Sequence, residues 1–318
     1  MDRVHLPLSP FDPTAGTLVF APERNEEGYW VGCPGVRHDG EQFWLTYRQR
    51  RPRGAEAERG WRCAVAKSKD GLHFTDVWQV RKHELMTSSM ERFCLLPRPG
   101  GGYRLYICYV DPADNRWRID ALEATEPERF DIRAATPVLT AASTGTEGVK
   151  DPYVLQTGPV FHLFASYAAA RHGLGPEAHA TGDVFNVGVT THPTGYATSL
   201  DGACFDWHGT ALEVGTGWDR YQARLNSIVP VCGGYIGFYD GSAGKHENYE
   251  ERCGIAISSN LSRWRSLSTT KPWVVSPNGS GSVRYVDAII LEQEWWIYYE
   301  MTRPDGAHEL RLVRLPSS

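Results

Sequence analysis

The stretch Val149-Lys150-Asp151-Pro152-Tyr153-Val154-Leu155, followed by Phe161-His162-Leu163-Phe164-Ala165-Ser166-Tyr167, decides the fold. The pattern predicts a buried strand that begins at an Asp-Pro step, a tight turn, and a second strand with alternating apolar residues. Four other parts of the chain show the same two-strand unit. The sequence is therefore built on a repeat.

The other four copies are found at residues 33–36 with 43–47, 92–96 with 103–107, 224–229 with 235–239, and 285–290 with 295–299. Anchors at residues 33, 92, 151, 225 and 285 are about 59, 59, 74 and 60 residues apart, which is typical of propeller blades. A second set of repeated residues recurs in register with these anchors. The end of a third strand, Ser68-Lys69-Asp70-Gly71-Leu72-His73-Phe74, shares its small-to-aromatic spacing with residues 124–130, 199–205 and 258–264.

These repeats predict an all-β fold, because helical periodicity is weak and two-residue alternation is common. We expect a five-bladed β-propeller with four-stranded antiparallel blades, formed by residues 1–318 as a single domain. The last strand, near residues 309–315, is expected to pair with residues 17–20 and so close the ring.

Bulk composition narrows the class of protein. The chain has 318 residues, a formal net charge of -5 and 22% charged residues, which favours neither nucleic acid nor an anionic membrane as a partner. It lacks a signal-peptide pattern and any run of 18 apolar residues. Seven scattered cysteines without a CxxC pair indicate buried thiols in a reducing compartment. A cytoplasmic protein is expected.

The propeller topology predicts where a site would lie. The starts of the inner strands and the loops after the second strands share one face, and these loops are residues 48–59, 111–116, 168–194, 240–251 and 302–308. The extra length of the third blade falls in residues 171–192, which carry His172, His179, Asp183 and His192 among several glycines. This segment is interpreted as a lid, a substrate contact or a tolerated insertion.

The inner-strand starts should be apolar if they only formed a core. Instead they carry charged and polar residues, namely Cys33, Glu91, Arg92, Lys150, Asp151, Arg224, Asn226, Arg284 and Tyr285. Because buried charge is costly unless it is paired, this ring is either a water-filled binding pocket or a salt-bridged plug. We favour the pocket, with nearby Trp and Tyr suited to sugar rings.

The repeated strand start, the Lys150-Asp151-Pro152 step and the Ser-x-Asp-Gly-x-x-Phe strand ends resemble the five-bladed propeller glycosidases. These comprise glycoside hydrolase families 43, 32 and 68 and the mannoside phosphorylases of family 130. The resemblance implies a base Asp on the first blade, a second Asp near the chain middle that tunes pKa, and an acid Glu on a later blade. Asp151 matches the second role. Cys33-Pro34 stands at the first position, and Arg224-Leu225-Asn226 begins the fourth inner strand, so the usual base and acid are missing from their usual places.

Glycoside cleavage usually requires two carboxyl groups. We expect Glu91 and Asp151 to be the central pair, with Glu147 or Glu251 as the partner acid. A salt bridge to a ring arginine is the structural alternative for each. The remaining polar residues of the ring, together with Asp240 from the acid-rich loop at residues 239–252, are expected to contact substrate.

The three ring arginines, Arg92, Arg224 and Arg284, are suited to a phosphate or a substrate carboxylate. Cys33 is interpreted as a small filler, since a nucleophilic role would need a neighbouring cation to lower its pKa. No metal or cofactor is expected, because the histidines lack a compact metal-binding spacing. The sequence thus predicts a glycoside hydrolase acting on a small carbohydrate. The alternatives are a phosphate-dependent phosphorylase and a non-catalytic carbohydrate-binding propeller.

Overall fold

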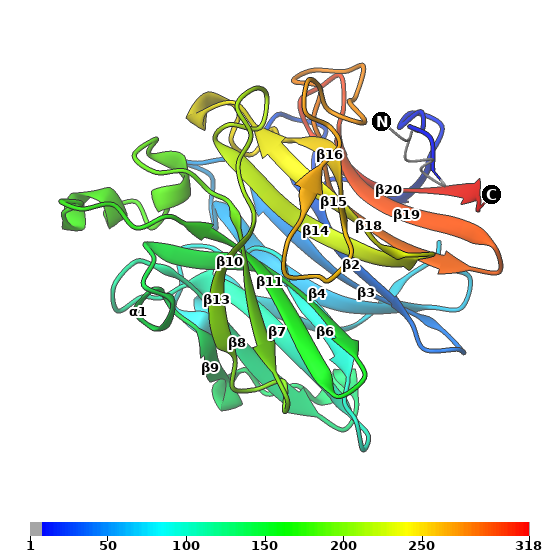
Figure 1. Ribbon diagram of the computed structural model, residues 1–318, viewed down its shortest axis with the longest axis horizontal. Helices are drawn as coiled ribbons and strands as arrows, with labels where there is room; N and C mark the ends of the chain where they lie inside the picture. The colour runs from blue at the N-terminus through cyan, green and yellow to red at the C-terminus, as the bar shows by residue number, and fades with distance from the viewer. Residues whose placement is uncertain (1–7, 318) are drawn as a thin grey trace.

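The computed structural model describes residues 8–317 and shows an all-β protein (Figure 1). Three sheets contain four antiparallel strands each. They are β6(Cys94–Pro97), β7(Tyr103–Val110), β8(Trp117–Ala124) and β9(Thr136–Leu139); β10(Gly148–Thr157), β11(Val160–Ala168), β12(Thr194–Ser199) and β13(Asp206–Leu212); and β14(Gln222–Val231), β15(Gly234–Ser242), β16(Arg252–Ser258) and β17(Arg265–Ser266).

The fourth sheet has eight strands and consists of two antiparallel groups. One is β2(Trp30–His38), β3(Phe43–Arg51), β4(Arg59–Ser68) and β5(Thr75–Arg81), and the other is β18(Val283–Leu291), β19(Glu294–Thr302) and β20(His308–Pro316) with β1(Thr17–Phe20). A single parallel pair, Trp30 with His308, joins the two groups. We number the repeats one to five, beginning with β2, β6, β10, β14 and β18. No sheet within residues 8–317 closes on itself.

Helices are few and short. They comprise α1(Ala141–Thr144) and the 3₁₀ turns η1(Lys82–Leu85), η2(Pro127–Arg129), η3(Ile132–Ala134), η4(Pro176–His179), η5(Val184–Asn186) and η6(Lys245–Glu247). None of the helices described in residues 8–317 is both long and apolar enough to cross a membrane.

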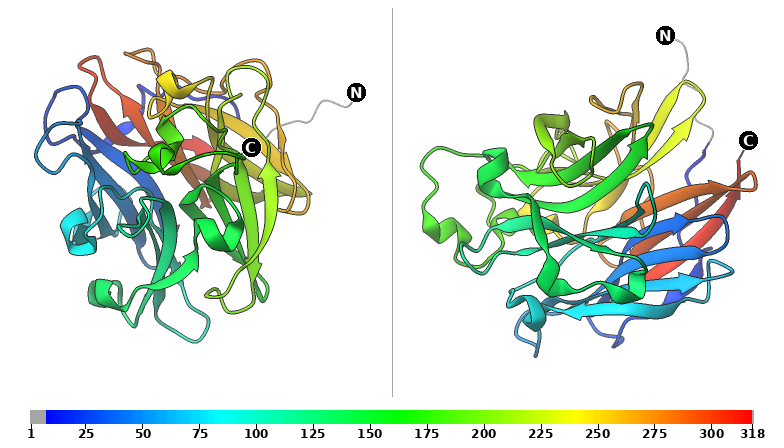
Figure 2. Two further views of the ribbon diagram at one scale, coloured as in Figure 1. Left: turned by 90° about the vertical axis from the view of Figure 1, so that its left-hand side faces the viewer. Right: turned by 90° about the horizontal axis from the view of Figure 1, so that it is seen from below.

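The first strands of the five repeats lie around a common centre. Each contacts the first strand of the next repeat, and β18 contacts β2. Figure 2 (left) shows the sheets following one another around this centre. The predicted strand pairs and third-strand ends are confirmed, because β4, β8, β12 and β16 end at Ser68, Ala124, Ser199 and Ser258.

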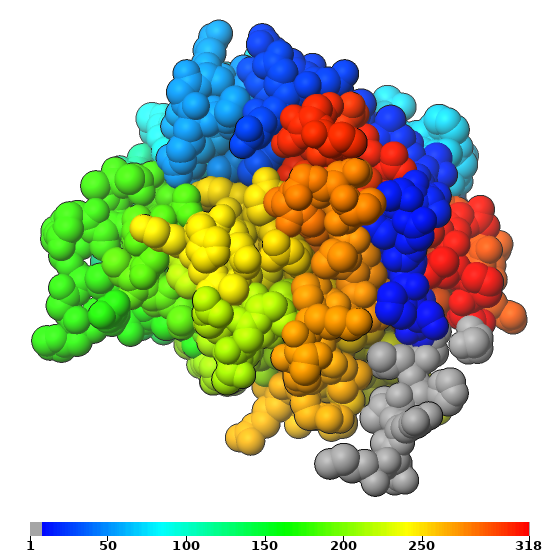
Figure 3. Space-filling model, turned by 90° about the horizontal axis from the view of Figure 1, so that it is seen from above, coloured from blue at the N-terminus to red at the C-terminus, as the bar shows by residue number. Residues whose placement is uncertain are grey.

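The N-terminal stretch completes the fifth repeat. As expected, β1 pairs with β20, with Thr17 opposite Leu312. Leu8 and Phe11 are buried in the apolar cluster that contains Val274 and Tyr299. Figure 3 shows this stretch, in dark blue, packed between the orange and red parts of the chain. The fifth repeat is thus built from both ends of the described chain.

The start of the first strand is bulged in four repeats. Strand pairing skips residues between Gly32 and Gly35, between Lys150 and Tyr153, between Leu225 and Ser227, and between Arg284 and Asp287. In three of these bulges, Cys33, Asp151 and Tyr285 adopt φ values of 59°, 58° and 50°. The prolines of Cys33-Pro34 and Asp151-Pro152 fit here because a bulge needs no ladder N–H. The residues that anchor the sequence repeat are therefore largely bulge residues.

The Ser-x-Asp-Gly strand ends form a local turn. The Ser68 hydroxyl accepts hydrogen bonds from the backbone N–H groups of Asp70 and Gly71, and Asp70 accepts from the next two. The turn at Ser199 repeats this pattern. The Gly71 carbonyl also accepts a hydrogen bond from Tyr298 of repeat five, at 2.6 Å. The motif therefore shapes strand ends and links neighbouring repeats.

Close packing between repeats one and two predicts a strong effect at Gly60. A methyl group there would overlap the carbonyl oxygen of Met90, which belongs to the backbone and cannot rotate away. We expect Gly60→Ala to lower the free energy of unfolding by at least about 2 kcal/mol in urea titrations. Gly217→Ala is the control, since only Thr269 lies near its added methyl group. Equal stability of both variants would contradict this packing.

Candidate functional site

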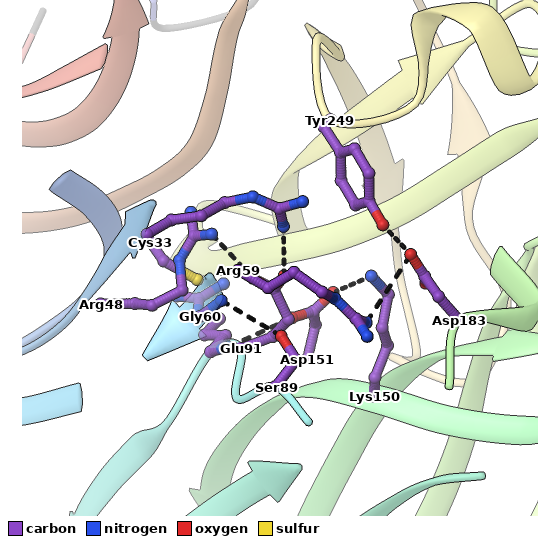
Figure 4. Close-up of polar contacts among 12 residues, drawn as sticks. Cys33, Arg48, Arg59, Gly60, Ser89, Glu91, Lys150, Asp151, Asp183 and Tyr249 are labelled. Carbon is purple, nitrogen blue, oxygen red and sulfur yellow. Dashed lines mark hydrogen bonds and ion pairs between the residues drawn. The ribbon is translucent and has the colours of Figure 1, made fainter. Parts of the chain in front are cut away.

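A cluster of charged side chains occupies the centre of the ring (Figure 4). It contains six carboxylates and six basic groups, each with at most 5% of its surface exposed. We call it the axial cluster. Its members are Glu91, Asp151, Asp240, Glu251, Asp287 and Glu300 with Arg48, Arg50, Arg92, Lys150, Arg224 and Arg284. The structure therefore brings together most of the site residues predicted from the sequence.

Glu91 lies between two arginines of repeat one. Its Oε1 is 3.1 Å from the Arg50 guanidinium and its Oε2 is 3.2 Å from that of Arg48. The Tyr285 hydroxyl donates to the same Oε2 at 3.3 Å. The predicted alternative for Glu91, a salt bridge to an arginine, is present, although the partners are Arg48 and Arg50.

Asp151 is held in its ionised form by neighbours from three repeats. Its Oδ2 is 2.9 Å from Arg224 and 3.6 Å from the Lys150 ammonium, and its Oδ1 accepts from the Arg92 backbone N–H at 3.2 Å. Burial alone would raise the pKa of this carboxyl, but Lys150 and Arg224 reverse the effect and leave the pKa below its usual value. Asp151 is thus a carboxylate at neutral pH.

Cys33, Glu91 and Asp151 face one another. The Cys33 sulfur and one oxygen from each carboxylate lie within 4.8 Å of one another, which is close enough to share a metal ion. Burial raises the pKa of the Cys33 thiol well above 9.0, so the thiol remains protonated. Both carboxylates already have cationic partners. The donor set therefore fits an ion-paired acid pair beside a neutral thiol better than it fits a metal centre.

Arg224 connects Asp151 to a second acid, Asp240. The other terminal nitrogen of its guanidinium is 2.5 Å from Asp240 Oδ2. Burial, together with the nearby negative charge of Glu251, raises the pKa of Asp240 to about 6 despite Arg224. The pKa values of two carboxyls that share one guanidinium are thus shifted in opposite directions. This is the arrangement that separates an acid from a base.

Arg284 forms ion pairs with two further acids of the cluster. It is 2.8 Å from Glu251 and 2.7 Å from Glu300. Burial opposes ionisation, but Arg224 and Arg284 lower the pKa of Glu251 to about 2. In the same way, Arg284 and Arg48 overcome the effect of burial and hold the pKa of Glu300 well below its usual range. Both groups are therefore ionised.

Tyr285 fills the space between the arginines. Its ring centroid lies 3.9 Å from the Arg224 guanidinium carbon and 5.2 Å from that of Arg284, within the range of cation–π attraction. Burial raises the pKa of its hydroxyl well above 10.0, so the group donates to Glu91. The positive φ of its backbone directs the Tyr285 N–H to Asp240 at 3.0 Å.

The predicted open pocket is replaced here by an ion-paired centre. Arg92 is 2.9 Å from Asp287, Arg224 bridges Asp151 and Asp240, and Arg284 bridges Glu251 and Glu300. Charged residues were expected at the strand starts, but the sequence does not specify their partners. The structure shows them buried, with Arg224 and Arg284 each shared between two carboxylates.

Residues 169–193 lie over one side of the cluster, and Figure 4 shows Asp183 and Tyr249 pointing toward each other there. Asp183 is hydrogen-bonded to the Tyr249 hydroxyl and lies 3.1 Å from Arg53. Arg59 donates to the carbonyls of residues 181 and 182. Phe185 lies 4.7 Å from the Lys150 ammonium. The segment is therefore fastened to repeats one, three and four.

Glu147 lies apart from the axial cluster. Its carboxylate contacts Arg116 at 2.8 Å and His179 at 3.0 Å, and it is partly exposed. The sequence grouped it with Glu91 and Asp151, but the structure connects it to His179 of residues 169–193 instead.

Asn226 is fully buried in its bulge, and its backbone carbonyl accepts a hydrogen bond from Arg92.

Several cluster residues were missed by the sequence analysis: Arg48, Arg50, Asp287, Glu300 and the buried His308. The sequence does contain a pattern that marks three of the charged residues. Arg48, Asp240 and Glu300 occupy one register position on the second strand, opposite Gly32, Arg224 and Arg284. A charge at a fixed place within an apolar run marks this position. His308 links Glu300 to Glu250.

The lowered pKa of Glu251 predicts a pH-dependent contribution to stability. The ionised group stabilises the fold above pH 4.5, its ordinary pKa, and this contribution is lost as the pH falls toward 2. We expect Glu251→Gln to reduce the free energy of unfolding by about 3 kcal/mol at pH 7 and by much less at pH 3, measured by urea titration. The exposed Glu213→Gln is the control. An equal loss at both pH values would contradict this pairing.

Comparison with known proteins places the fold. No protein-family model matches the sequence, and no curated protein matches it either.

Solved structures do match the fold of this chain. A protein described as a glycoside hydrolase has a TM-score of 0.70 and 14% identity, over 95% of this chain and 92% of that one. A beta-1,2-mannobiose phosphorylase from Listeria innocua has a TM-score of 0.61 and 12% identity, over 92% and 90%. The GH43_1 enzyme from Xanthomonas citri has a TM-score of 0.61 and 13% identity, over 94% and 91%. The chain thus has a fold that resembles the glycoside hydrolase-like propellers.

Proposed function

We propose that the five repeats are the blades of a five-bladed propeller and that the protein is a glycosidase with its active site at the axial cluster. The observation that carries this proposal is the approach of Glu91 and Asp151, whose nearest oxygens lie within 4.8 Å. Retaining glycosidases place two carboxyls about 5–5.5 Å apart, and inverting enzymes place them about 6.5–9.5 Å apart. Glu91 and Asp151 are therefore close enough to act in one site, and the choice between retention and inversion depends on which acid acts with Asp151.

Asp151 is suited to be the nucleophile or base, because its lowered pKa keeps it ionised. Asp240 is suited to be the acid, because its pKa of about 6 leaves a protonated fraction near neutral pH. Glu251, with a pKa of about 2, is a weaker choice for that role. Glu91, which is ion-paired with Arg48 and Arg50, would be a fixed charge that faces Asp151 across the site.

Two observations bear on the alternatives. A mannobiose phosphorylase is among the structural neighbours, but Arg92, Arg224 and Arg284 already hold carboxylates, so a phosphate would have to displace them. The neutral Cys33 thiol stands where the resembled families place a carboxylate, which favours a propeller that binds sugar without cleaving it. Cleavage assays with and without phosphate separate all three functions.

Substitution of the central pair tests the glycosidase proposal. We expect Asp151→Asn and Glu91→Gln to reduce turnover by about 10²–10⁴-fold on the best substrate of an aryl-glycoside panel, assayed with and without phosphate. Both variants should also lose stability, because each breaks a buried ion pair. Asp120→Asn is the control, since it breaks the partly buried pair with Arg118 away from the axis. It should lose stability but retain activity. Full activity in the two axial variants would exclude this site.

Access to the pair requires movement, because Glu91 is 2% and Asp151 0% exposed. We propose that residues 169–193 are a lid that opens for substrate. The segment is held by polar contacts such as that of the buried Asp183 with the exposed Arg53, and opening would exchange these contacts for contacts with water.

A disulfide between the lid and the loop after β15 tests this movement. A Cβ at Gly188 would lie 3.7 Å from that of Lys245, within the range of a disulfide. In a background with Cys204 and Cys232 changed to serine, we expect oxidised Gly188→Cys/Lys245→Cys to lose at least about 90% of turnover. Reductant should restore it. The single Gly188→Cys variant controls for strain at this positive φ. Full activity in the oxidised form would exclude the lid.

A further inference from the structure

A second group of buried polar side chains lies beside the axial cluster, where residues 169–193 join repeat four. His192 and Gln222 lie side by side, because their backbones form a parallel bridge. The His192 N–H donates to the Tyr221 carbonyl at 2.8 Å, and its carbonyl accepts from Ala223 at 3.0 Å. Both side chains are fully buried. Their positions are thus fixed by the backbone.

The hydrogen-bonding capacity of these two side chains is only partly used by the protein. Within residues 8–317, neither ring nitrogen of His192 has a partner, and neither does Oε1 of Gln222. The amide nitrogen of Gln222 donates to Glu251 at 3.1 Å, which fixes the amide orientation. Buried polar groups are nearly always hydrogen-bonded. A partner from outside the chain is therefore indicated.

The charge state of the group defines the chemistry of that partner. Burial and the nearby Lys150 lower the pKa of His192 well below 6.5, so its ring is neutral and offers one donor and one acceptor. Gln222 adds an acceptor. Lys150 adds donors, since among the described residues it forms an ion pair with Asp151 alone, at 3.6 Å. A phosphate or carboxylate would use only the donors, whereas a hydroxyl both donates and accepts.

Aromatic rings surround the same polar atoms. The His192 ring lies 4.6 Å from Phe185 and 4.6 Å from Tyr221, measured between ring centroids. The Lys150 ammonium lies 4.7 Å from Phe185 and 5.3 Å from Trp117. Polar atoms set among aromatic faces suit a ligand with hydroxyl groups on a ring that has apolar C–H faces.

We propose that His192, Gln222 and Lys150 form a subsite for the hydroxyl groups of a neutral sugar ring, adjacent to Glu251. The inference deepens the proposed function and rests on it, since it names the class of substrate. His192 and Gln222 then determine specificity and leave the bond-breaking chemistry to the carboxylates. Because Phe185 belongs to the proposed lid, the subsite is complete only when residues 169–193 are closed.

The test measures binding separately from cleavage. Neutral monosaccharides and uronic acids are titrated into wild type, His192→Phe and Gln222→Leu by calorimetry, and KM and kcat are measured on the best glycoside. Phenylalanine keeps an aromatic ring at this position and removes both ring nitrogens of His192. We expect each variant to raise Kd and KM for the neutral sugar about ten-fold, the loss of roughly one hydrogen bond, with kcat changed less than about three-fold.

Thermal stability distinguishes a binding role from a structural one. Because the removed atoms have no protein partner, the Tm of His192→Phe should equal or exceed that of wild type. His162→Phe is the control, since both nitrogens of that buried histidine are bonded, to Thr157 and Tyr196. It should lower Tm and leave Kd unchanged.

The outcomes separate this inference from the proposed function. If wild type binds a neutral sugar without cleaving any glycoside, and His192→Phe weakens binding, the subsite stands and the glycosidase proposal fails. If wild type cleaves a glycoside and His192→Phe has unchanged Kd and KM, the subsite alone is overturned. Binding of uronic acids only, or of no sugar at all, also overturns it.

Discussion

The guanidinium group of Arg224 is the contact on which the centre of this molecule depends. It extends from β14, pairs with Asp151 of β10 and Asp240 of β15, and stacks on Tyr285 of β18. A buried guanidinium is stable only when its charge is matched, so three repeats must hold their side chains in place at once. Arg48 likewise forms ion pairs with both Glu91 and Glu300 and so connects three repeats. The centre is therefore joined by charge where an ordinary core would be joined by apolar packing.

Under the proposed function, this pairing would also prepare the site for chemistry. A network of fixed charges in a dry interior can stabilise charge that develops during a reaction without reorganising. Here it gives Asp240 and Asp151 opposite pKa shifts although they share one arginine. The same network resists a ligand that would have to break ion pairs. The neutral sugar proposed above would avoid that cost, because its hydroxyl groups would occupy unused donors and acceptors at the edge of the network.

Much of the fold could be predicted from the sequence because its signals are local. Strand alternation, turn residues and the spacing of the anchors depend on neighbours a few residues apart, and the pairing of β1 with β20 followed from the repeat count. The charged strand starts were also visible. Their partners were not, since Arg48 and Glu300 are 252 residues apart and only the folded ring brings them together. The Ser-x-Asp-Gly motif marked strand ends correctly, because its hydrogen bonds are local to one turn.

The bulges at the strand starts bear on how such a protein can change during evolution. In repeats one, three and five the same left-handed backbone presents a thiol, a carboxylate and a phenol to one small volume. The ladder on either side of each bulge forms without these side chains. A single codon change at such a position therefore alters the chemistry of the centre and leaves the strand register intact. Cys33 and Asp151, which share a backbone conformation and a following proline, show how far two copies of one position can diverge.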